Sequence, residues 1–403
     1  MSHKAHFRRL VLVYSITAFL FTFGAGLAQI VENPAKPKAA SAGRVVVAEE
    51  VLAISDEGTS EFYFYWPRDP RTAPDGSLLL SDKDQILLFG PDGKFRRNFF
   101  KKGQGPGEVT YFGVCWPTDK NVIVQSVYPN KLILFDHAGK YEREIRMGTL
   151  PGTRRPQALL LLVRGEEYYF RAWDSPPFEK EEPEFVDMPR TILALNAATG
   201  ELKTLATFST KAYIQASPGG GGGAHYPVSD LIAVRFKEKY IALTHTEEYR
   251  VKIYEPGTNT IVREFRRIYD RVKPEPLTEE QKKGGAMIGN KPFRPPELKY
   301  QNDIRNLLAR GEEIWAVTST KDEAKGILID VFDGAGVYRD CFWLKLPEAA
   351  SKSLLSPGQS ALDGEFLWIV EKSEDETFSI KKYRVASSQA RGTVPLRGQS
   401  PAI

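Results

Sequence analysis

A ten-residue pattern of strand, tight turn and returning strand recurs along this chain of 403 residues and constrains its fold more than any other feature. The pattern is Ile-Leu-Leu-Phe-Gly-Pro-Asp-Gly-Lys-Phe at 86–95 and Leu-Ile-Leu-Phe-Asp-His-Ala-Gly-Lys-Tyr at 132–141, with Gly93 aligned to Gly139. The same spacing returns at 332–338. Hairpins that recur in this way predict a repeat protein made of antiparallel strands.

The repeat length indicates the kind of repeat protein. Gly93 and Gly139 are 46 residues apart, close to the length of a four-stranded propeller blade. Pro and Gly in the turns at 73–76 and 91–93 supply the φ angles that tight turns need. The pattern therefore predicts an all-β fold, a six-bladed β-propeller of four-stranded antiparallel blades. The blades are expected at about 66–100, 111–146, 157–208, 229–268, 303–346 and 353–385.

The last blade lacks an outermost strand in this scheme. A strand pattern at 44–54, rich in valine, has no hairpin partner near it in the sequence. A ring of blades leaves no bare edge when the two ends of the chain share one blade. We therefore expect the propeller, at 44–385, to be closed by the N-terminal strand completing the last blade.

Four segments lie outside the blade pattern. Residues 29–43 are small, polar and proline-containing and are expected to form a flexible leader. The acidic residues 174–189 are expected to form a loop, and 386–403 a disordered tail. A polar insertion at 269–300, with a short helical pattern at 279–283, separates two blades.

The first 28 residues have the features of a signal peptide. Three basic residues precede an apolar run at 10–23, and small residues follow at 26–28. The run of 14 residues is shorter than the roughly 20 that span a membrane, so cleavage before Gln29 is favoured over a retained anchor. The protein is expected to be exported, either periplasmic or secreted, with no membrane span after cleavage. These basic residues account for most of the formal net charge of +4, so no nucleic-acid partner is indicated.

The two cysteines, Cys115 and Cys341, lie in apolar contexts in the second and fifth predicted blades. A disulfide requires Cα atoms within about 7 Å of each other, and these blades lie on opposite sides of the ring. Although export permits a disulfide, two buried free thiols are the favoured prediction.

A further motif, Gly-Gln-Gly-Pro-Gly-Glu at 103–108, follows the first hairpin. With this segment the chain resembles the NHL-like six-bladed β-propellers of exported bacterial proteins, in which such a motif follows an outer strand and leads into the next blade. The resemblance implies the propeller fold, but many of these proteins have no assigned activity. The motif lacks the Gly-Lys-Ser/Thr ending of a phosphate loop, so an interblade turn is the favoured interpretation.

Propellers bind ligands where their inner strands converge, at the mouth of the central channel, so charged and aromatic residues near those strands are candidate ligand-binding residues. Guanidinium groups suit carboxylates, phosphates and stacked rings, so an anionic or sugar-like ligand is one interpretation. For any single residue of the set, the favoured interpretation is a structural ion pair between blades or a surface charge. The candidates are Trp66, Arg68, Asp69, Arg71, Arg171, Trp173, Asp174, Arg235, Asn302, Asp303 and Arg305.

The aromatic run Phe-Tyr-Phe-Tyr-Trp at 62–66 leads into the first blade. Core packing is its expected role, and a stacking surface is the alternative.

Catalytic motifs are sparse. No two histidines of the mature chain have metal-ligand spacing, and no nucleophile elbow is present. His245 on a predicted strand of the fourth blade is the one weak acid/base candidate, because the pKa of histidine suits proton transfer near neutral pH. The favoured function is a non-catalytic binding or scaffold propeller without a cofactor, recognising a protein, peptide or glycan. The alternative is a divalent-metal-dependent hydrolase or lyase of the gluconolactonase-like kind. Resemblance to those propellers implies carboxylate and amide ligands around a divalent cation, for which Asp69, Asn302 and Asp303 are the nearest candidates.

Overall fold

The computed structural model describes residues 30–385, except 153, 155, 220, 221, 277–285, 289 and 290. The predicted signal peptide at 1–28, the helical pattern at 279–283 and the tail at 386–403 lie outside the described residues. Within the described part, strands dominate, and the short helix α3 (Glu348–Leu354) precedes the last sheet. The all-β prediction is confirmed.

The described residues form six sheets of four or five strands, numbered here 1 to 6 in chain order. Sheet 1 contains β4 (Arg68–Thr72), β5 (Leu78–Asp82), β6 (Gln85–Phe89) and β7 (Phe95–Asn98). Sheet 2 contains β8 (Tyr111–Pro117), β9 (Val122–Tyr128), β10 (Asn130–Phe135) and β11 (Tyr141–Arg146). Sheet 3 contains β12 (Gln157–Arg164), β13 (Glu167–Trp173), β14 (Glu184–Leu195), β15 (Leu202–Ala216) and β16 (Gly223–Pro227).

Sheets 4 to 6 each include a strand from the start of the described chain. Sheet 4 contains β17 (Ile232–Phe236), β18 (Tyr240–Thr244), β19 (Arg250–Glu255), β20 (Thr260–Arg267) and β1 (Ile30–Asn33). Sheet 5 contains β23 (Ile304–Arg310), β24 (Glu313–Asp322), β25 (Gly326–Asp333), β26 (Tyr338–Lys345) and β2 (Arg44–Val47). Sheet 6 contains β27 (Ser360–Asp363), β28 (Phe366–Lys372), β29 (Phe378–Arg384) and β3 (Glu49–Ile54).

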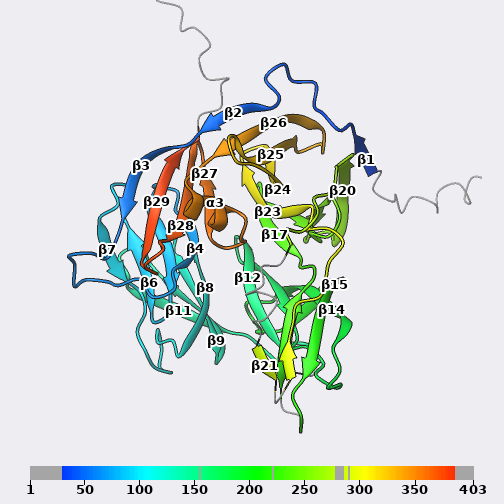
Figure 1. Cartoon of the computed structure of the whole chain (residues 1–403). Helices are drawn as coiled ribbons and strands as arrows, with labels where there is room; N and C mark the ends of the chain where they lie inside the picture. Colours follow the sequence, from blue (N-terminus) through cyan, green and yellow to red (C-terminus); the bar gives the residue numbers. More distant parts are fainter. Residues whose placement is uncertain are drawn as a thin grey trace, which may run out of the picture.

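The six sheets are arranged around a common centre (Figure 1). The strands nearest the centre are β4, β8, β12, β17, β23 and β27, and each contacts the next, with β27 returning to β4. This propeller-like arrangement brings one strand of every sheet to the middle of the molecule.

The hydrophobic core is divided among the spaces between neighbouring sheets. One cluster of buried residues fills each of the six spaces around the ring, including the space between sheets 6 and 1. Because each sheet has a neighbour on both faces, its middle strands are apolar on both faces. Every residue of β5 and β6 is buried, whereas burial in the outer strand β11 is incomplete.

The N-terminal segment at 30–54 runs around the outside of three sheets, from β1 beside β20 past β26 to β29 (Figure 1). β1 and β2 add parallel strands to β20 and β26, and β3 pairs antiparallel with β29. The prediction of a flexible leader at 29–43 is therefore wrong for β1. Backbone hydrogen bonds to β20 order this strand, although its sequence has no repeating apolar pattern. The strand expected at 44–54 is divided at Ala48 between sheets 5 and 6. Sheets 4 and 5 are mixed rather than purely antiparallel, because β1 and β2 are parallel to their neighbours.

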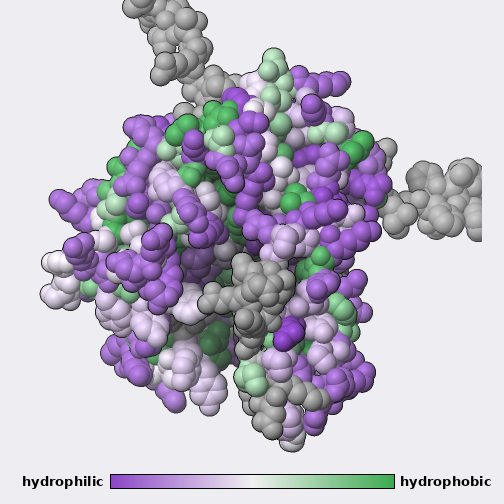
Figure 2. Space-filling model, viewed as in Figure 1, coloured by the Kyte–Doolittle hydropathy of each residue, from purple (hydrophilic) through white to green (hydrophobic). Residues whose placement is uncertain are grey.

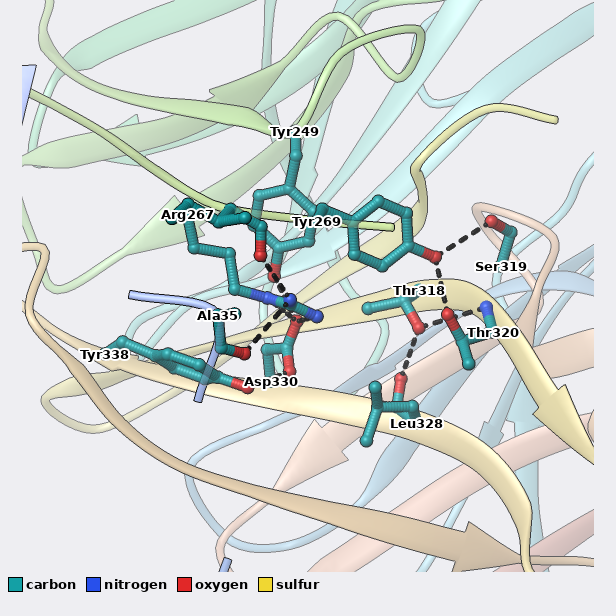
Figure 3. Close-up of polar contacts among 11 residues, drawn as sticks. Ala35, Tyr249, Arg267, Tyr269, Thr318, Ser319, Thr320, Leu328, Asp330 and Tyr338 are labelled. Carbon is teal, nitrogen blue, oxygen red and sulfur yellow. Dashed lines mark hydrogen bonds and ion pairs between the residues drawn. The ribbon is translucent and has the colours of Figure 1, made fainter. Parts of the chain in front are cut away.

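A buried polar cluster lies where this segment crosses between sheets 4 and 5 (Figure 3). Arg267 donates from Nε and Nη2 to the carboxylate of Asp330, at 2.8 and 2.7 Å. The same carboxylate accepts hydrogen bonds from the hydroxyls of Tyr249 and Tyr338. Arg267 also donates to the carbonyl oxygen of Ala35 at 3.4 Å, so the cluster is tied to the N-terminal segment. Burial opposes a charged Arg267, but the tyrosines and Asp330 around it raise its pKa.

Sheet 3 extends beyond the blade pattern. Residues 184–189, expected to lie in a loop, form the first half of β14 and pair with β15 past the end of β13. In the insertion at 269–300, β21 (Ala286–Ile288) and β22 (Lys291–Phe293) form a hairpin that contacts β16. Phe293 packs on Tyr213 of β15, with ring centroids 5.8 Å apart.

The two cysteines are free and buried, as predicted. Cys115 lies 3.2 Å from the hydroxyl of Ser81, and burial raises the pKa of its thiol to about 12. Across the described residues, no helix combines the length and apolar character needed to cross a membrane.

Candidate functional site

A cavity of about 380 Å³ lies at the centre of the ring and takes its lining from the innermost strands of all six sheets. Apolar side chains contribute about half of the lining surface, and they include Val114, the leucines at 159–161 and Val234. Hydroxyl and amide groups from Thr72, Ser360 and Asn306 also contribute. A volume of this size is within the range of small-ligand sites.

The innermost strands all begin at the same end of the ring, which we call the mouth. Asp69, at the start of β4, donates its backbone N–H to the carbonyl oxygen of Gly358, just before β27. Arg171 of β13 pairs with Leu159, which lies near the start of β12. The Arg171 guanidinium donates a hydrogen bond to the carbonyl oxygen of Leu231, the residue just before β17. Residues from four different sheets therefore meet at the mouth.

The same end includes the two remaining sheets. Ile304, the first residue of β23, donates its backbone N–H to the carbonyl oxygen of Thr246. Thr246 follows the last residue of β18, which pairs with the first residue of β17. In sheet 2, Gln125 of β9 donates to the carbonyl oxygen of Ala158 and accepts the backbone N–H of Leu160, both near the start of β12. These two hydrogen bonds fix the orientation of β8 and β9 beside β12. The mouth is therefore a face to which every sheet contributes.

Asp69 has an unusual backbone conformation. Its φ is +52°, in the left-handed region, although the next residue is Pro70 and residues before proline are normally extended. The hydrogen bond to Gly358, at 2.7 Å, holds this conformation. Gly358 itself has φ +81°, and a Cβ there would lie 3.1 Å from the Asp69 carboxylate. Strained backbone of this kind is concentrated at functional sites.

The Asp69 carboxylate lies among guanidinium groups. Burial raises the pKa of Asp69, while the positive charges of Arg71, Arg68 and Arg171 lower it. Its side chain retains 24% exposure, so a ligand or water can reach it.

Arg71 lines the cavity on the same strand. Its guanidinium stacks on Trp116 of sheet 2, 3.9 Å from the ring centroid. Burial lowers the pKa of Arg71, and the charge of Asp69 opposes that effect. Its buried Nε has no hydrogen-bond acceptor in the described residues. The Arg71 guanidinium is therefore held between the Trp116 ring and the charge of Asp69.

Two further arginines line the cavity from sheets 3 and 4. Arg171 bonds the Leu231 carbonyl oxygen at 2.5 Å, and its guanidinium lies 5.7 Å from the ring of Trp173. Arg235 is exposed, and its ion partner at 3.3 Å is Glu238 outside the cavity. The charged residues of the lining are therefore three arginines and one aspartate.

The cavity brings together only part of the predicted candidate set. Asp69, Arg71, Arg171 and Arg235 line it. Trp66 is outside at the mouth, with 64% of its surface exposed, and Arg68 and Trp173 also lie beside the cavity rather than in its lining. Asp174 accepts the backbone N–H of Arg154 in a separate loop contact.

The candidates from sheet 5 have other positions. The carboxylate of Asp303 accepts a hydrogen bond from Arg271 of the insertion at 2.9 Å, and burial raises its pKa while Arg271 lowers it. Neither Asp303 nor its neighbours Asn302 and Arg305 line the cavity. Asp303 and Arg305 alternate with Ile304 and Asn306 along the chain, and of these four residues only Asn306 lines the cavity.

His245 lies away from the central cavity. It lines a separate cavity of about 230 Å³ at the base of the sheet 3 extension, with its ring edge-on to Phe208. Burial lowers the pKa of His245, and Lys252 and Arg250 lower it further. Its Nε2 has no partner in the described part of the chain. The structure therefore does not place this weak catalytic candidate beside the cavity arginines.

The motif at 103–108 forms a turn between sheets 1 and 2. Glu108 accepts the backbone N–H of Gly105 at 3.0 Å and pairs with Lys101 at 3.0 Å. Gly103 has φ +154°, and a Cβ there would lie only 2.0 Å from the Glu108 carboxylate. The interblade-turn interpretation explains both glycine and glutamate.

The alternative function requires a group of side chains that can hold a divalent metal ion. Within the described residues, no three His, Cys, Asp or Glu side chains are grouped so as to hold a metal ion. Asp69 is the one carboxylate in the cavity lining.

Comparisons with known proteins complete the description of the site. No family model and no curated protein matches the sequence. Among solved structures, a protein of Bacteroides fragilis described as exported has 8% identity and a TM-score of 0.46, covering 89% of this chain and 100% of its own. A DUF4221 family member from Bacteroides vulgatus has 11% identity and a TM-score of 0.49, covering 86% and 99%. A gluconolactonase of Xanthomonas campestris has 12% identity and a TM-score of 0.41, covering 85% and 98%. Similarity at these levels assigns no function.

Proposed function

We propose that this chain is an exported, six-bladed β-propeller of the NHL-like kind, closed by β3, which binds an anionic ligand in its central cavity without acting on it chemically. The ligand is a carboxylate-bearing or phosphate-bearing group, either free or part of a peptide, protein or glycan. Export follows from the signal-like pattern at 1–28, and the site belongs to the propeller expected at 44–385, to which β1 adds residues 30–33.

The ring geometry supports the fold assignment. Each of the six sheets contributes its first strand to the centre, and the core cluster between sheets 6 and 1 includes Ile54 of β3. This closure leaves no bare edge on β29, since β3 pairs along it from Ile54 to Glu49.

The observation that carries the binding proposal is the charge of the cavity lining. Three guanidinium groups and one carboxylate leave an excess of positive charge in a cavity that protein surrounds on several sides, where charge interactions are stronger than in bulk water. Arg71 is held over the Trp116 ring, so its guanidinium group is already oriented before a ligand enters. An anion satisfies these groups, whereas a cation would be repelled by them.

The alternative, a divalent-metal-dependent hydrolase or lyase, needs several oxygen ligands around one point. Asp69 supplies a carboxylate, but Asn302 and Asp303 are not part of the cavity lining. We therefore place the binding function first.

Calorimetric titration tests this proposal with a panel of mono-, di- and tricarboxylates and inorganic phosphate. Wild type is expected to bind at least one of them, more weakly as salt increases. Arg71→Met and Arg235→Met should each weaken that binding about tenfold or more, since a hydrogen bond to a charged group contributes about 1.5–3 kcal/mol. Arg339→Met is the matched control, because Arg339 is exposed and pairs with Asp333 on an outer hairpin.

Two results would overturn the proposal. The first is a wild-type protein that binds no member of the panel, or whose affinity is the same in both cavity variants. The second is a stoichiometric divalent ion in the purified protein whose chelation lowers the melting temperature, which would favour the metal-dependent alternative. The exposed Arg235 gives a test that does not depend on core packing.

A further inference from the structure

Exposed aromatic side chains are concentrated at the mouth of the ring. Of the aromatic residues with large exposed surfaces in the described chain, five lie at this end of sheets 1 and 2. They are Tyr63, Tyr65, Trp66, Tyr111 and Tyr128, with exposures of 48%, 56%, 64%, 66% and 64%.

Strand register places these rings at one end. Trp66 lies two residues before β4, in the segment that continues through Arg68 and Asp69 into the cavity. Tyr111 is the first residue of β8 and pairs across the sheet with Tyr128 at the end of β9. The segments that carry Trp66 and Tyr111 therefore lead directly into β4 and β8, two of the strands that line the cavity.

The loop at 63–66 is held in place by buried polar groups. Asp82, which has no exposed surface, accepts the backbone N–H groups of Tyr65 and Trp66 at 2.8 and 2.7 Å. Gln85 exchanges two hydrogen bonds with the backbone of Tyr63. Burial raises the pKa of Asp82, while the backbone N–H groups lower it.

Alternate residues of the same segment have opposite environments. Phe62 is buried, and Phe64 packs beside it in the core between sheets 6 and 1. The intervening Tyr63 and the following Tyr65 and Trp66 face solvent. The core-packing expectation for 62–66 is thus correct for the phenylalanines, whereas the stacking alternative fits the tyrosines and the tryptophan.

An ordered loop with exposed rings is suited to binding, because little conformational entropy is lost when a ligand stacks on it. Cations accompany the rings: the Lys83 ammonium lies 4.0 Å from the Tyr65 ring centroid, and Arg68, two residues after Trp66 in the chain, is exposed. A complementary ligand needs flat apolar faces, many hydroxyl groups and negative charges. Sugar rings that bear carboxylates have all three.

We propose that the mouth binds an acidic oligosaccharide, a chain of uronic acid residues. Its sugar rings stack on the mouth aromatics, and the carboxylate of a terminal residue enters the cavity to meet Arg71 and Arg171. This inference rests on the proposed function, because the cavity must accept an anion for the terminal residue to enter.

Calorimetry with galacturonic acid, its linear hexamer and the fully methyl-esterified hexamer tests the proposal. The hexamer should bind at least tenfold more tightly than the monomer, because only the longer chain reaches the aromatic rings. Esterification should weaken binding about tenfold or more by removing the charges. Trp66→Ala and Tyr128→Ala should each weaken hexamer binding several-fold to tenfold.

Tyr141→Ala is the matched control. Tyr141 is an exposed aromatic residue at the start of β11, the outer strand of sheet 2, and its pairing with Phe135 places it at the end opposite to the mouth. Its replacement should leave hexamer affinity unchanged. Melting curves of all variants establish that each is folded.

The outcomes separate the two proposals. Binding of small carboxylates without any gain for the hexamer, or a gain that Trp66→Ala leaves intact, overturns the glycan inference and leaves the anion site standing. No binding of small carboxylates or hexamer overturns both. A hexaglutamate peptide that binds more tightly than the uronate hexamer, with dependence on Trp66, would show an acidic peptide to be the ligand and overturn the glycan inference.

Discussion

The side-chain oxygen of Asn33 accepts the backbone N–H of Tyr338 at 2.9 Å, joining residues 305 positions apart. The Asn33 amide nitrogen donates to the carbonyl oxygens of Gly336 and Arg266, at 2.9 and 3.1 Å. One buried amide thus ties β1 to the outer hairpin of sheet 5 and the last strand of sheet 4. The N-terminal segment is therefore an ordered part of the propeller wall.

Replacing Asn33 by Ala should lower the free energy of unfolding by about 1–3 kcal/mol. The change leaves the buried N–H of Tyr338 without its acceptor, and an unsatisfied buried group costs about that amount. Urea unfolding measures the difference, and Lys36→Ala on the exposed part of the same segment is the control. Equal free energies of unfolding for the two variants would show that the hydrogen bonds of Asn33 contribute nothing to stability.

Closure by β3 should be needed for a stable fold. Ile54 is buried between sheets 6 and 1, whereas Val51 on the same strand is 38% exposed. Ile54→Ala should cost about 2–5 kcal/mol and Val51→Ala much less, because only the first leaves a cavity in the core. Deleting 44–54 should expose the edge of β29 and reduce stability sharply. A deletion variant that melts like the parent would contradict closure.

The Arg267–Asp330 pair should be costly to break from one side. Arg267→Met leaves a buried carboxylate without its cation, and such a change typically destabilises a protein by about 3–5 kcal/mol. The double variant Arg267→Met/Asp330→Leu should recover part of this loss, because no charge then remains buried. Denaturant melts of the single and double variants decide the matter. A double variant less stable than the sum of both single changes would contradict this account.

Stability should depend on pH through Asp69. Burial raises its pKa above the ordinary value near 3.8, against the opposing charges of the arginines. The folded state therefore holds this proton more firmly than the unfolded state, and stability falls as pH rises through the raised pKa. Asp69→Asn removes the dependence and tolerates the left-handed backbone, so its advantage over wild type should grow from pH 4 to 7. Urea titrations at each pH measure it, and a variant less stable at pH 7 would refute the assignment.

Local patterns predicted the hairpins because a hairpin is decided by nearby residues. Gly93 and Gly139, aligned in the repeat, have φ of +78° and +79°, as their turns require. Sheet 1, at 68–98, and the strands β27 to β29 of sheet 6, at 360–384, lie within their predicted blades, whereas sheet 3 continues past residue 208 to Pro227. No local pattern predicted that β1 would be a strand. Its conformation is fixed by backbone pairing with β20 and by the hydrogen bonds of Asn33, whose partners are distant in sequence.

The candidate site was predictable only in part. The sequence indicated where inner strands begin, and Asp69, Arg71, Arg171 and Arg235 do lie in the central lining. It did not indicate which neighbouring residues turn away, as Asp303 and Arg305 do, because a strand alternates its side chains and only packing decides which set faces the centre. The role of Gly358 in holding Asp69 depends on the meeting of sheets 1 and 6.

By itself, the sequence determined the all-β class, the repeat of strand and turn, and the apolar strands that fill the spaces between sheets, since these depend on residues within one repeat length. Tertiary structure alone decided that the N-terminal segment follows the edges of three sheets and that arginines from sheets 1, 3 and 4 share one cavity. The physical reason is that the ring joins strands about 290 residues apart, such as β4 and β27, through contacts that no local pattern specifies.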